Sequence, residues 1–264
     1  MLGKLFKYDF KWINRFMPVY FVVLLLVSVF TKIVEYMLNS NPSLLLVIID
    51  KVLVSMFIGC SVSIMITCIM RIWVRFINNI YKDESYLTHT LPVTDSQIFN
   101  SKILAGIVSL LISALVIAIC VLLVYINKDT IDYIKMMWNS LVEAYNYFFA
   151  VGFIIGFVLI IALEILYIMM AGIFGIVVGH CFNNFKMIKS IVAGIGSYFF
   201  LSGFSLIVVF IINNFIEYDM IGNGFPSKNY VGIMGVVAIL IYLIYNLIYY
   251  FISRKIFNRG VNVE

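Results

Sequence analysis

The side chains that could do chemistry in this sequence are few and far apart. The two histidines, His89 and His180, are isolated and have no paired carboxylates, and no His-Glu-x-x-His motif occurs. We therefore predict no metal site and no catalytic residues. The four cysteines lie in or beside apolar runs, at spacings that fit neither a zinc site nor a disulfide framework: Cys60, Cys68, Cys120 and Cys181. We interpret them as reduced, small apolar residues.

Glu164 is the one carboxylate deep within a long apolar run. A charge at the centre of a membrane-spanning helix costs about 3 kcal/mol on insertion scales, so it needs a cavity, a basic partner or a proton. Glu164 could line a translocation path, contacting substrate or closing a gate. It could instead form a hydrogen bond with a neighbouring Ser, Thr or Tyr, for instance Tyr167 one turn on. The sequence leaves both interpretations open.

The elements that must position these side chains are membrane-spanning helices. The 264 residues are 64% hydrophobic and only 12% charged, whereas a soluble domain carries about 25% charged residues. Six apolar runs are long enough to span a bilayer, at about 16–37, 44–76, 103–125, 147–179, 190–213 and 230–252. We predict an all-α polytopic membrane protein, with residues 1–264 as a single transmembrane domain. The fourth run is either one tilted helix or a broken one.

Two glycine pairs in the fourth run have the spacing that lets helix backbones approach closely. They are Gly152 with Gly156, and Gly175 with Gly179. We favour packing inside the chain over a seam between two copies.

The distribution of Lys and Arg predicts the orientation. With the N-terminus inside, thirteen of these residues fall on the inner side and five, Lys32, Lys51, Lys128, Lys135 and Lys228, on the outer side. Both termini and residues 77–102 are then cytoplasmic. The expected outer loops, at roughly 38–43, 126–146 and 214–229, are mildly acidic through Asp129, Asp132, Glu143, Glu217 and Asp219.

Residues 1–15 have the pattern of an amphipathic elbow helix that lies along the inner membrane surface. Within about 80° of helical arc lie the basic residues Lys4, Lys7, Lys11 and Arg15. Asp9 falls on the opposite, apolar side. It either pairs with a nearby lysine at the headgroup level or contacts a cytoplasmic partner or a neighbouring helix.

The longest polar interval in the first half of the chain, residues 81–102, joins the second and third spans. Pro92 ends any helix that precedes it. Thr94 and Gln97 have capping-box spacing, which predicts a new helix from about Asp95 into the third span. Before the proline, DESYLTHTL predicts a short amphipathic element that points into the cytoplasm.

Three segments carry a resemblance to a known family: LGKLFKYDFKW, ESYLTHTLPVTDSQIFNSKIL and GHCFNNFKMIKSIVAGIGSYF. They resemble, in turn, the elbow helix, the loop between the second and third spans, and the inner turn between the fourth and fifth spans of type-2 ATP-binding-cassette (ABC) permeases, in the small bacterial six-span subfamily. The six-span layout extends the resemblance along the whole chain. Ser85 is a departure, since a glycine is common there, and it puts the local backbone turn in doubt.

The resemblance implies that a coupling helix within 81–98 docks in a groove of a separate cytoplasmic ATPase. The implied docking residues are Glu84, Tyr86, Leu87, His89, Leu91 and Pro92. The chain lacks the GxxxxGK[ST] phosphate loop, so ATP and Mg would be bound by that ATPase and no cofactor by this chain. A second permease copy, or a similar partner, would complete the path.

The expected function is therefore that of the permease subunit of an ABC exporter in the bacterial plasma membrane. It is not an enzyme by itself, and no nucleic acid is implied. The small outer loops favour export over import, and the resemblance suggests hydrophobic or amphipathic substrates such as antimicrobial or toxin peptides. The alternatives are a proton-coupled secondary transporter that uses Glu164 and, less favoured, an intramembrane enzyme.

Overall fold

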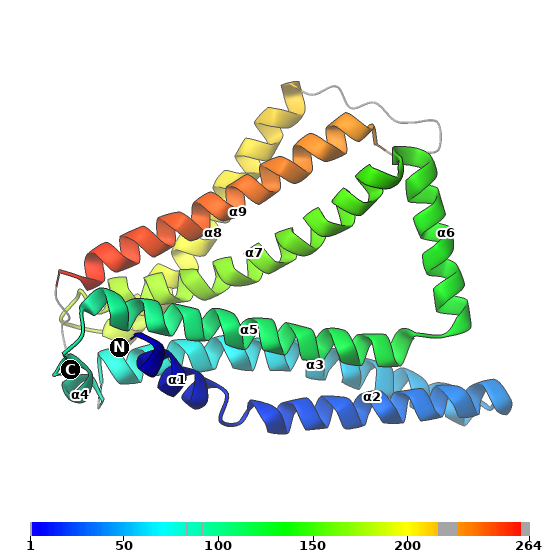
Figure 1. Ribbon diagram of the computed structural model, residues 1–264, viewed down its shortest axis with the longest axis horizontal. Coiled ribbons are helices and arrows are strands. Elements are labelled where there is room, and N and C mark those ends of the chain that lie inside the picture. The colour runs from blue at the N-terminus through cyan, green and yellow to red at the C-terminus, as the bar shows by residue number, and fades with distance from the viewer. Residues whose placement is uncertain (1, 83, 91, 216–225, 260–264) are drawn as a thin grey trace. The chain divides into compact units, whose positions relative to one another are not determined.

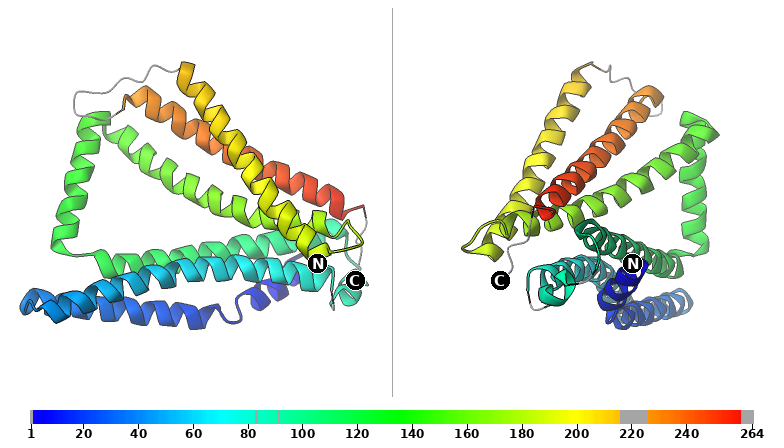
Figure 2. Two further views of the ribbon diagram at one scale, coloured as in Figure 1. Left: turned by 180° about the vertical axis from the view of Figure 1, so that it is seen from behind. Right: turned by 60° about the vertical axis from the view of Figure 1, so that its left-hand side comes forward.

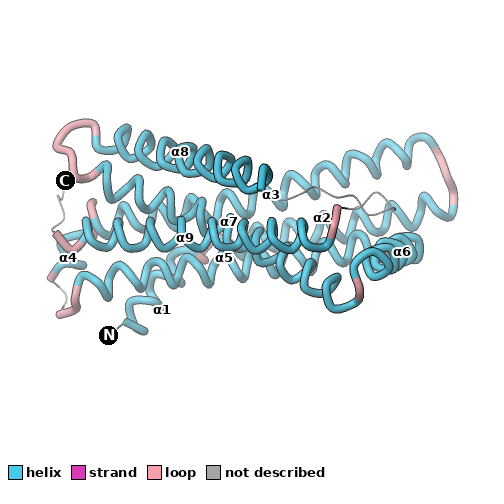
Figure 3. The backbone as a smooth tube through the Cα atoms, turned by 90° about the horizontal axis from the view of Figure 1, so that it is seen from above, coloured by secondary structure: helices cyan, strands magenta, loops and turns pink. Residues whose placement is uncertain are grey.

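The computed structural model describes residues 2–82, 84–90, 92–215 and 226–259. Within these ranges the elements are helices, with no β-strand between them (Figures 1 and 3). They are α1 (Leu2–Ile13), α2 (Met17–Ser40), α3 (Leu44–Ile80), α4 (Ser85–His89), α5 (Asp95–Tyr125), α6 (Lys128–Tyr145), α7 (Tyr147–Gly179), α8 (Lys186–Phe215) and α9 (Lys228–Phe257).

Six of these helices are long and apolar enough to cross a membrane, namely α2, α3, α5, α7, α8 and α9. The prediction of an all-α protein with six spans is confirmed, and the chain is a multi-pass membrane protein. α7 is one unbroken helix of 33 residues, about 50 Å long at 1.5 Å per residue. α5 begins at Asp95 as predicted, although the Thr94 side chain makes no capping hydrogen bond.

The chain divides into two compact units, Met1–Thr130 and Ile131–Glu264. In the first unit α2, α3 and α5 pack against one another, and α1 lies against α5 and α3 (Figure 2). In the second unit α7 packs against both α8 and α9. That the two units together form a single transmembrane permease domain stays a prediction.

The segment 126–146, expected as an outer loop, contains the helix α6, which is not one of the six helices long and apolar enough to span a membrane. Its position on the outer side stays a prediction. Its apolar residues recur at helical spacing, as in Ile131, Ile134, Trp138 and Tyr145. Polar residues between them lower the average hydropathy, so this segment does not form an apolar run and its helix was not predicted. The loop 214–229 falls largely on residues 216–225, so Glu217 and Asp219 lie outside the described residues.

Close packing between α7 and α8 depends on two of the glycines. A Cβ atom added at Gly175 would lie 2.5 Å from the carbonyl oxygen of Ser190 and 2.6 Å from Cα of Gly194, and one added at Gly179 would also overlap the Ser190 backbone. A Cβ added at Gly152 or Gly156 would meet no atom within 4 Å. Packing inside the chain is thus confirmed for the second glycine pair only.

We expect Gly175→Ala to destabilise the second unit by about 1–3 kcal/mol, because the added methyl group overlaps rigid backbone atoms of α8. Gly156→Ala is the matched control. It lies in the same helix in open space, so the better helix propensity of alanine should stabilise the chain by up to about 1 kcal/mol. Equilibrium unfolding of the purified chain by SDS in mixed micelles measures both. Equal effects of the two substitutions would contradict the packing described here.

Candidate functional site

The segment implied to dock an ATPase forms the short helix α4, between α3 and α5. Its first two apolar side chains are strongly exposed, Tyr86 at 82% and Leu87 at 73%. Pro92, beyond the helix, is also exposed. Leu91 lies outside the described residues, and His89 ends the helix without a described side chain. The structure therefore presents Tyr86 and Leu87 as an uncovered apolar pair.

Glu84, the residue before α4, turns back toward the body of the first unit. Its Oε2 accepts a hydrogen bond of 2.6 Å from Nη1 of Arg75 and one of 2.9 Å from Nδ2 of Asn79. Both partners lie on the last two turns of α3. Ser85 follows as a buried residue, 2% exposed. Glu84 thus attaches the start of α4 to the end of α3.

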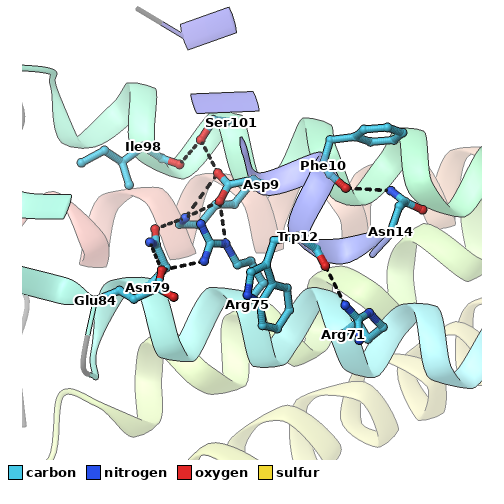
Figure 4. Close-up of polar contacts among 11 residues, drawn as sticks. Asp9, Phe10, Trp12, Asn14, Arg71, Arg75, Asn79, Glu84, Ile98 and Ser101 are labelled. Atoms are coloured by element: carbon cyan, nitrogen blue, oxygen red, sulfur yellow. Dashed lines mark hydrogen bonds and ion pairs between the residues drawn. The ribbon is translucent and has the colours of Figure 1, made fainter. Parts of the chain in front are cut away.

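Asp9 of α1 is the centre of the polar contacts (Figure 4). Its Oδ1 accepts from Nε of Arg75 at 2.8 Å and from Nζ of Lys102 at 3.2 Å. Its Oδ2 accepts from the hydroxyl of Ser101 at 3.1 Å. The residue is only 3% exposed. A single carboxylate on α1 therefore joins α3 and α5.

Asn79 connects the two carboxylates, because its Oδ1 accepts from Lys102 while its Nδ2 donates to Glu84. We call this set the buried polar network: Asp9, Arg75, Asn79, Glu84, Ser101 and Lys102. It contains two cations and two anions, so its charges balance. Balance matters because a buried charge without a partner is strongly destabilising.

α1 is attached at its C-terminal end as well. The Arg71 guanidinium donates to the carbonyl oxygens of Trp12 at 2.6 Å and Ile13 at 2.5 Å. It also lies 5.1 Å from the ring centroid of Trp12. A cation at the last carbonyls of a helix is favourable because it complements the helix dipole. α1 is therefore held to α3 at two separate points.

The sequence interpretation of Asp9 left two choices, and both are partly right. Asp9 does pair with a lysine, but that lysine is Lys102 on a neighbouring helix, and Arg75 is its closer cationic partner. The roles of Arg71 and Arg75 were missed. The sequence indicates Arg71 and Arg75 only as positive charges on the inner side. Helical periodicity does place Asp9 on the packed side of α1, which was the available signal.

A pocket of about 410 Å³ lies between α1 and α4, beside the buried polar network. Its apolar lining comes from Leu5, Tyr8, Leu87 and Ile98. Away from this packed side, α1 exposes Lys4, Lys7 and Lys11, and Arg15, two residues beyond the end of α1, is exposed as well. The predicted helix is present, and its position on a membrane surface stays a prediction.

We expect acidic pH to weaken the attachment of α4 to α3 through Glu84. Burial by itself raises the pKa of Glu84, but hydrogen bonds from Asn79 and the charge of Arg75 outweigh burial and lower this pKa below its ordinary value. Because the folded pKa is below the unfolded one, about 4.3, the attachment is complete above pH ~4.3 and is lost as pH falls through the folded pKa.

A nitroxide label at Tyr86→Cys, in a cysteine-free background, should become more mobile as pH falls from about 6 to about 3. In the Glu84→Gln variant the mobility should depend much less on pH. A label at Tyr133→Cys on α6 reports any general acid unfolding. Equal pH profiles with and without Glu84 would contradict the attachment.

Glu164 lies in the middle of α7 and is half-buried. The hydroxyl of Tyr167 donates instead to the carbonyl oxygen of Tyr198, at 2.9 Å, so the suggested bond between Glu164 and Tyr167 is wrong. Within the part of the chain that the structure describes, the Glu164 carboxylate makes no hydrogen bond and no ion pair.

The other reactive side chains do not gather into a site. His180 is buried at the end of α7, with Nδ1 2.8 Å from the carbonyl oxygen of Ile176. All four cysteines are free thiols. The described ranges hold no group of three or more His, Cys, Asp or Glu residues that could bind a metal ion. Comparison of the chain with protein-family models, curated proteins and solved structures finds no match.

Proposed function

We propose that this protein is the membrane-spanning permease subunit of a bacterial ABC exporter. A separate cytoplasmic ATPase would bind ATP and Mg, and a second permease copy or a similar partner would complete the path. The substrates would be hydrophobic or amphipathic, with antimicrobial or toxin peptides as the favoured class. The observation that carries the proposal is the exposed pair Tyr86 and Leu87 on α4, at the position where the resembling family docks its ATPase.

The surroundings of this pair support a docking role. Aromatic and apolar anchors rimmed by polar groups are typical of the centre of a protein interface. Leu87 lines the pocket of about 410 Å³, which can receive a side chain from the ATPase. In the proposed topology α4 is cytoplasmic, because the side that holds it also holds thirteen of the eighteen Lys and Arg residues.

The contacts that attach α4 to α3 support a route by which force would pass from the ATPase to the spanning helices. Glu84 connects α4 to α3, and the rest of the buried polar network connects α3 to α1 and α5. When ATP closes the two ATPase subunits, a push on α4 would therefore move three helices together. The basic face of α1 would meanwhile hold the unit at the inner membrane surface.

Co-purification tests the proposal. The tagged chain is expressed with the ATPase encoded by a neighbouring gene and reconstituted into liposomes with a fluorescent amphipathic peptide. We expect the ATPase to co-purify and peptide transport to require hydrolysable ATP. An ATPase variant with an inactivated phosphate loop is the control, and it should assemble without transporting.

The second candidate function is proton-coupled secondary transport. The observation that favours it is Glu164, a carboxylate in the middle of a spanning helix without an ion pair among the described residues. This candidate predicts transport driven by a proton gradient in liposomes that contain no ATPase. That outcome, together with failure of the ATPase to co-purify, would replace the exporter proposal.

A further inference from the structure

Glu164 lies at the centre of its helix, seventeen residues after Tyr147 and fifteen before Gly179. At 1.5 Å per residue this is more than about 20 Å from either helix end. The residue is half-buried, so Glu164 is not sealed inside the packing of the second unit. A carboxylate at this depth needs a cation, a proton or water.

A cluster of tyrosines packs next to Glu164 on the same side of α7. Tyr167, three residues later and therefore a neighbour on the helix surface, is 1% exposed. Its ring centroid lies 4.9 Å from that of Tyr198 on α8 and 5.9 Å from that of Tyr242 on α9. Tyr242 lies one turn before Asn246, whose side chain donates to the carbonyl oxygen of Leu163, the residue before Glu164. The three helices thus meet around one aromatic centre.

Two buried tyrosines of this cluster, Tyr245 and Tyr249 of α9, are held in place by hydrogen bonds. Tyr245 donates to the carbonyl oxygen of Leu201 at 2.9 Å, and Tyr249 donates to the hydroxyl of Ser197 at 3.1 Å. Asn246 donates to the carbonyl oxygen of Leu163 at 3.1 Å, directly beside Glu164. The outer rings, Tyr198 and Tyr242, are half-exposed. Tyr198 and Tyr242 are therefore the rings at the more exposed edge of this hydrogen-bonded cluster.

The spanning helices of the second unit carry no cation near Glu164. α7 has no Lys or Arg, and those of α8 and α9 lie within three residues of a helix end. In a two-fold dimer whose axis runs along the membrane normal, each residue of the second copy lies at the same depth as in the first. The same three helices of a second copy therefore bring no basic side chain to Glu164. An organic cation of a ligand is one partner that would satisfy the carboxylate, beside a proton or water.

We propose that Glu164, Tyr198 and Tyr242 form a binding site for the cationic group of an amphipathic ligand. The carboxylate supplies the counter-charge, and the tyrosine faces attract the cation through their ring quadrupoles. The ligand class is a monovalent organic cation on an apolar body, such as an amine or guanidinium of a cationic peptide. This inference rests on the proposed function only in taking the bound cation as the exported substrate.

Two probe ions of equal shape and opposite charge test the site. Binding of tetraphenylphosphonium and of tetraphenylborate to the purified chain in detergent is measured by equilibrium dialysis, without any ATPase. We expect saturable binding of the cation, weakened about tenfold or more by Glu164→Gln. Tyr242→Leu should weaken it about threefold, whereas Tyr242→Phe should retain it. Glu143→Gln on the exposed part of α6 is the matched control and should change nothing.

Absence of saturable tetraphenylphosphonium binding to the unsubstituted chain would overturn the proposal. So would equal binding by the unsubstituted chain and Glu164→Gln, or equal binding by Tyr242→Leu and Tyr242→Phe. If Glu164→Gln fails to fold, the two Tyr242 variants decide the question. Because no ATPase is present, the result is independent of the co-purification experiment, and either proposal can fail alone.

Discussion

Replacing Leu87 with Asp will abolish assembly with the ATPase and leave the chain folded. Leu87 is 73% exposed and its neighbour Tyr86 is 82% exposed, so neither side chain contributes much to packing within the chain. In an interface both would be buried, and a buried aspartate there would lose its hydration. Loss of a central apolar anchor costs about 2–4 kcal/mol, which weakens association by about thirtyfold to a thousandfold.

The measurement is the amount of ATPase that co-purifies with Leu87→Asp, together with ATP-dependent peptide transport. Tyr133→Asp is a matched control, since Tyr133 is also an exposed aromatic residue, at 67%, but lies on α6. It should leave assembly unchanged. Normal assembly of Leu87→Asp, with transport intact, would show that α4 is not the docking element.

Asp9→Ala will destabilise the first unit by about 3–5 kcal/mol, because it leaves buried cations without their counter-charge. Arg75 keeps Glu84 as a second partner at 2.6 Å, but Lys102 loses its only ion pair among the described residues. Glu84→Gln should cost less, about 1 kcal/mol or below, because the Glu84 side chain is 44% exposed and solvent screens its charge.

A second substitution separates lost charge balance from lost packing. In Asp9→Asn combined with Lys102→Met, the unpaired lysine is gone, so the double variant should be more stable than Asp9→Asn alone. SDS titration in mixed micelles gives the changes in free energy of unfolding for three variants, Asp9→Asn, Lys102→Met and the double variant. Additive losses in the double variant would mean that Asp9 and Lys102 act independently, contrary to their distance of 3.2 Å.

The spans could be predicted well because the bilayer imposes one simple requirement, a long apolar helix. α7 begins and ends at the predicted residues, and α5 begins at the predicted Asp95. The N-terminal helix was also predictable, since its basic residues recur at helical spacing. α6 was missed because its polar residues offset its apolar ones, so that only its periodicity marks it as a helix.

Hydropathy and helical periodicity predict the class of protein, the six apolar helices and the side of α1 on which Asp9 lies. The partners of Asp9 become visible only in the folded chain, since Arg75 is 66 residues away and Lys102 is 93 residues away. The fold likewise decides that Glu84 holds α4 to α3, and that Tyr198 and Tyr242 pack against Tyr167, one turn after Glu164. The physical reason is that hydropathy and helical periodicity depend on neighbours along the chain. An ion pair or a ring contact depends on which faces of distant helices pack together.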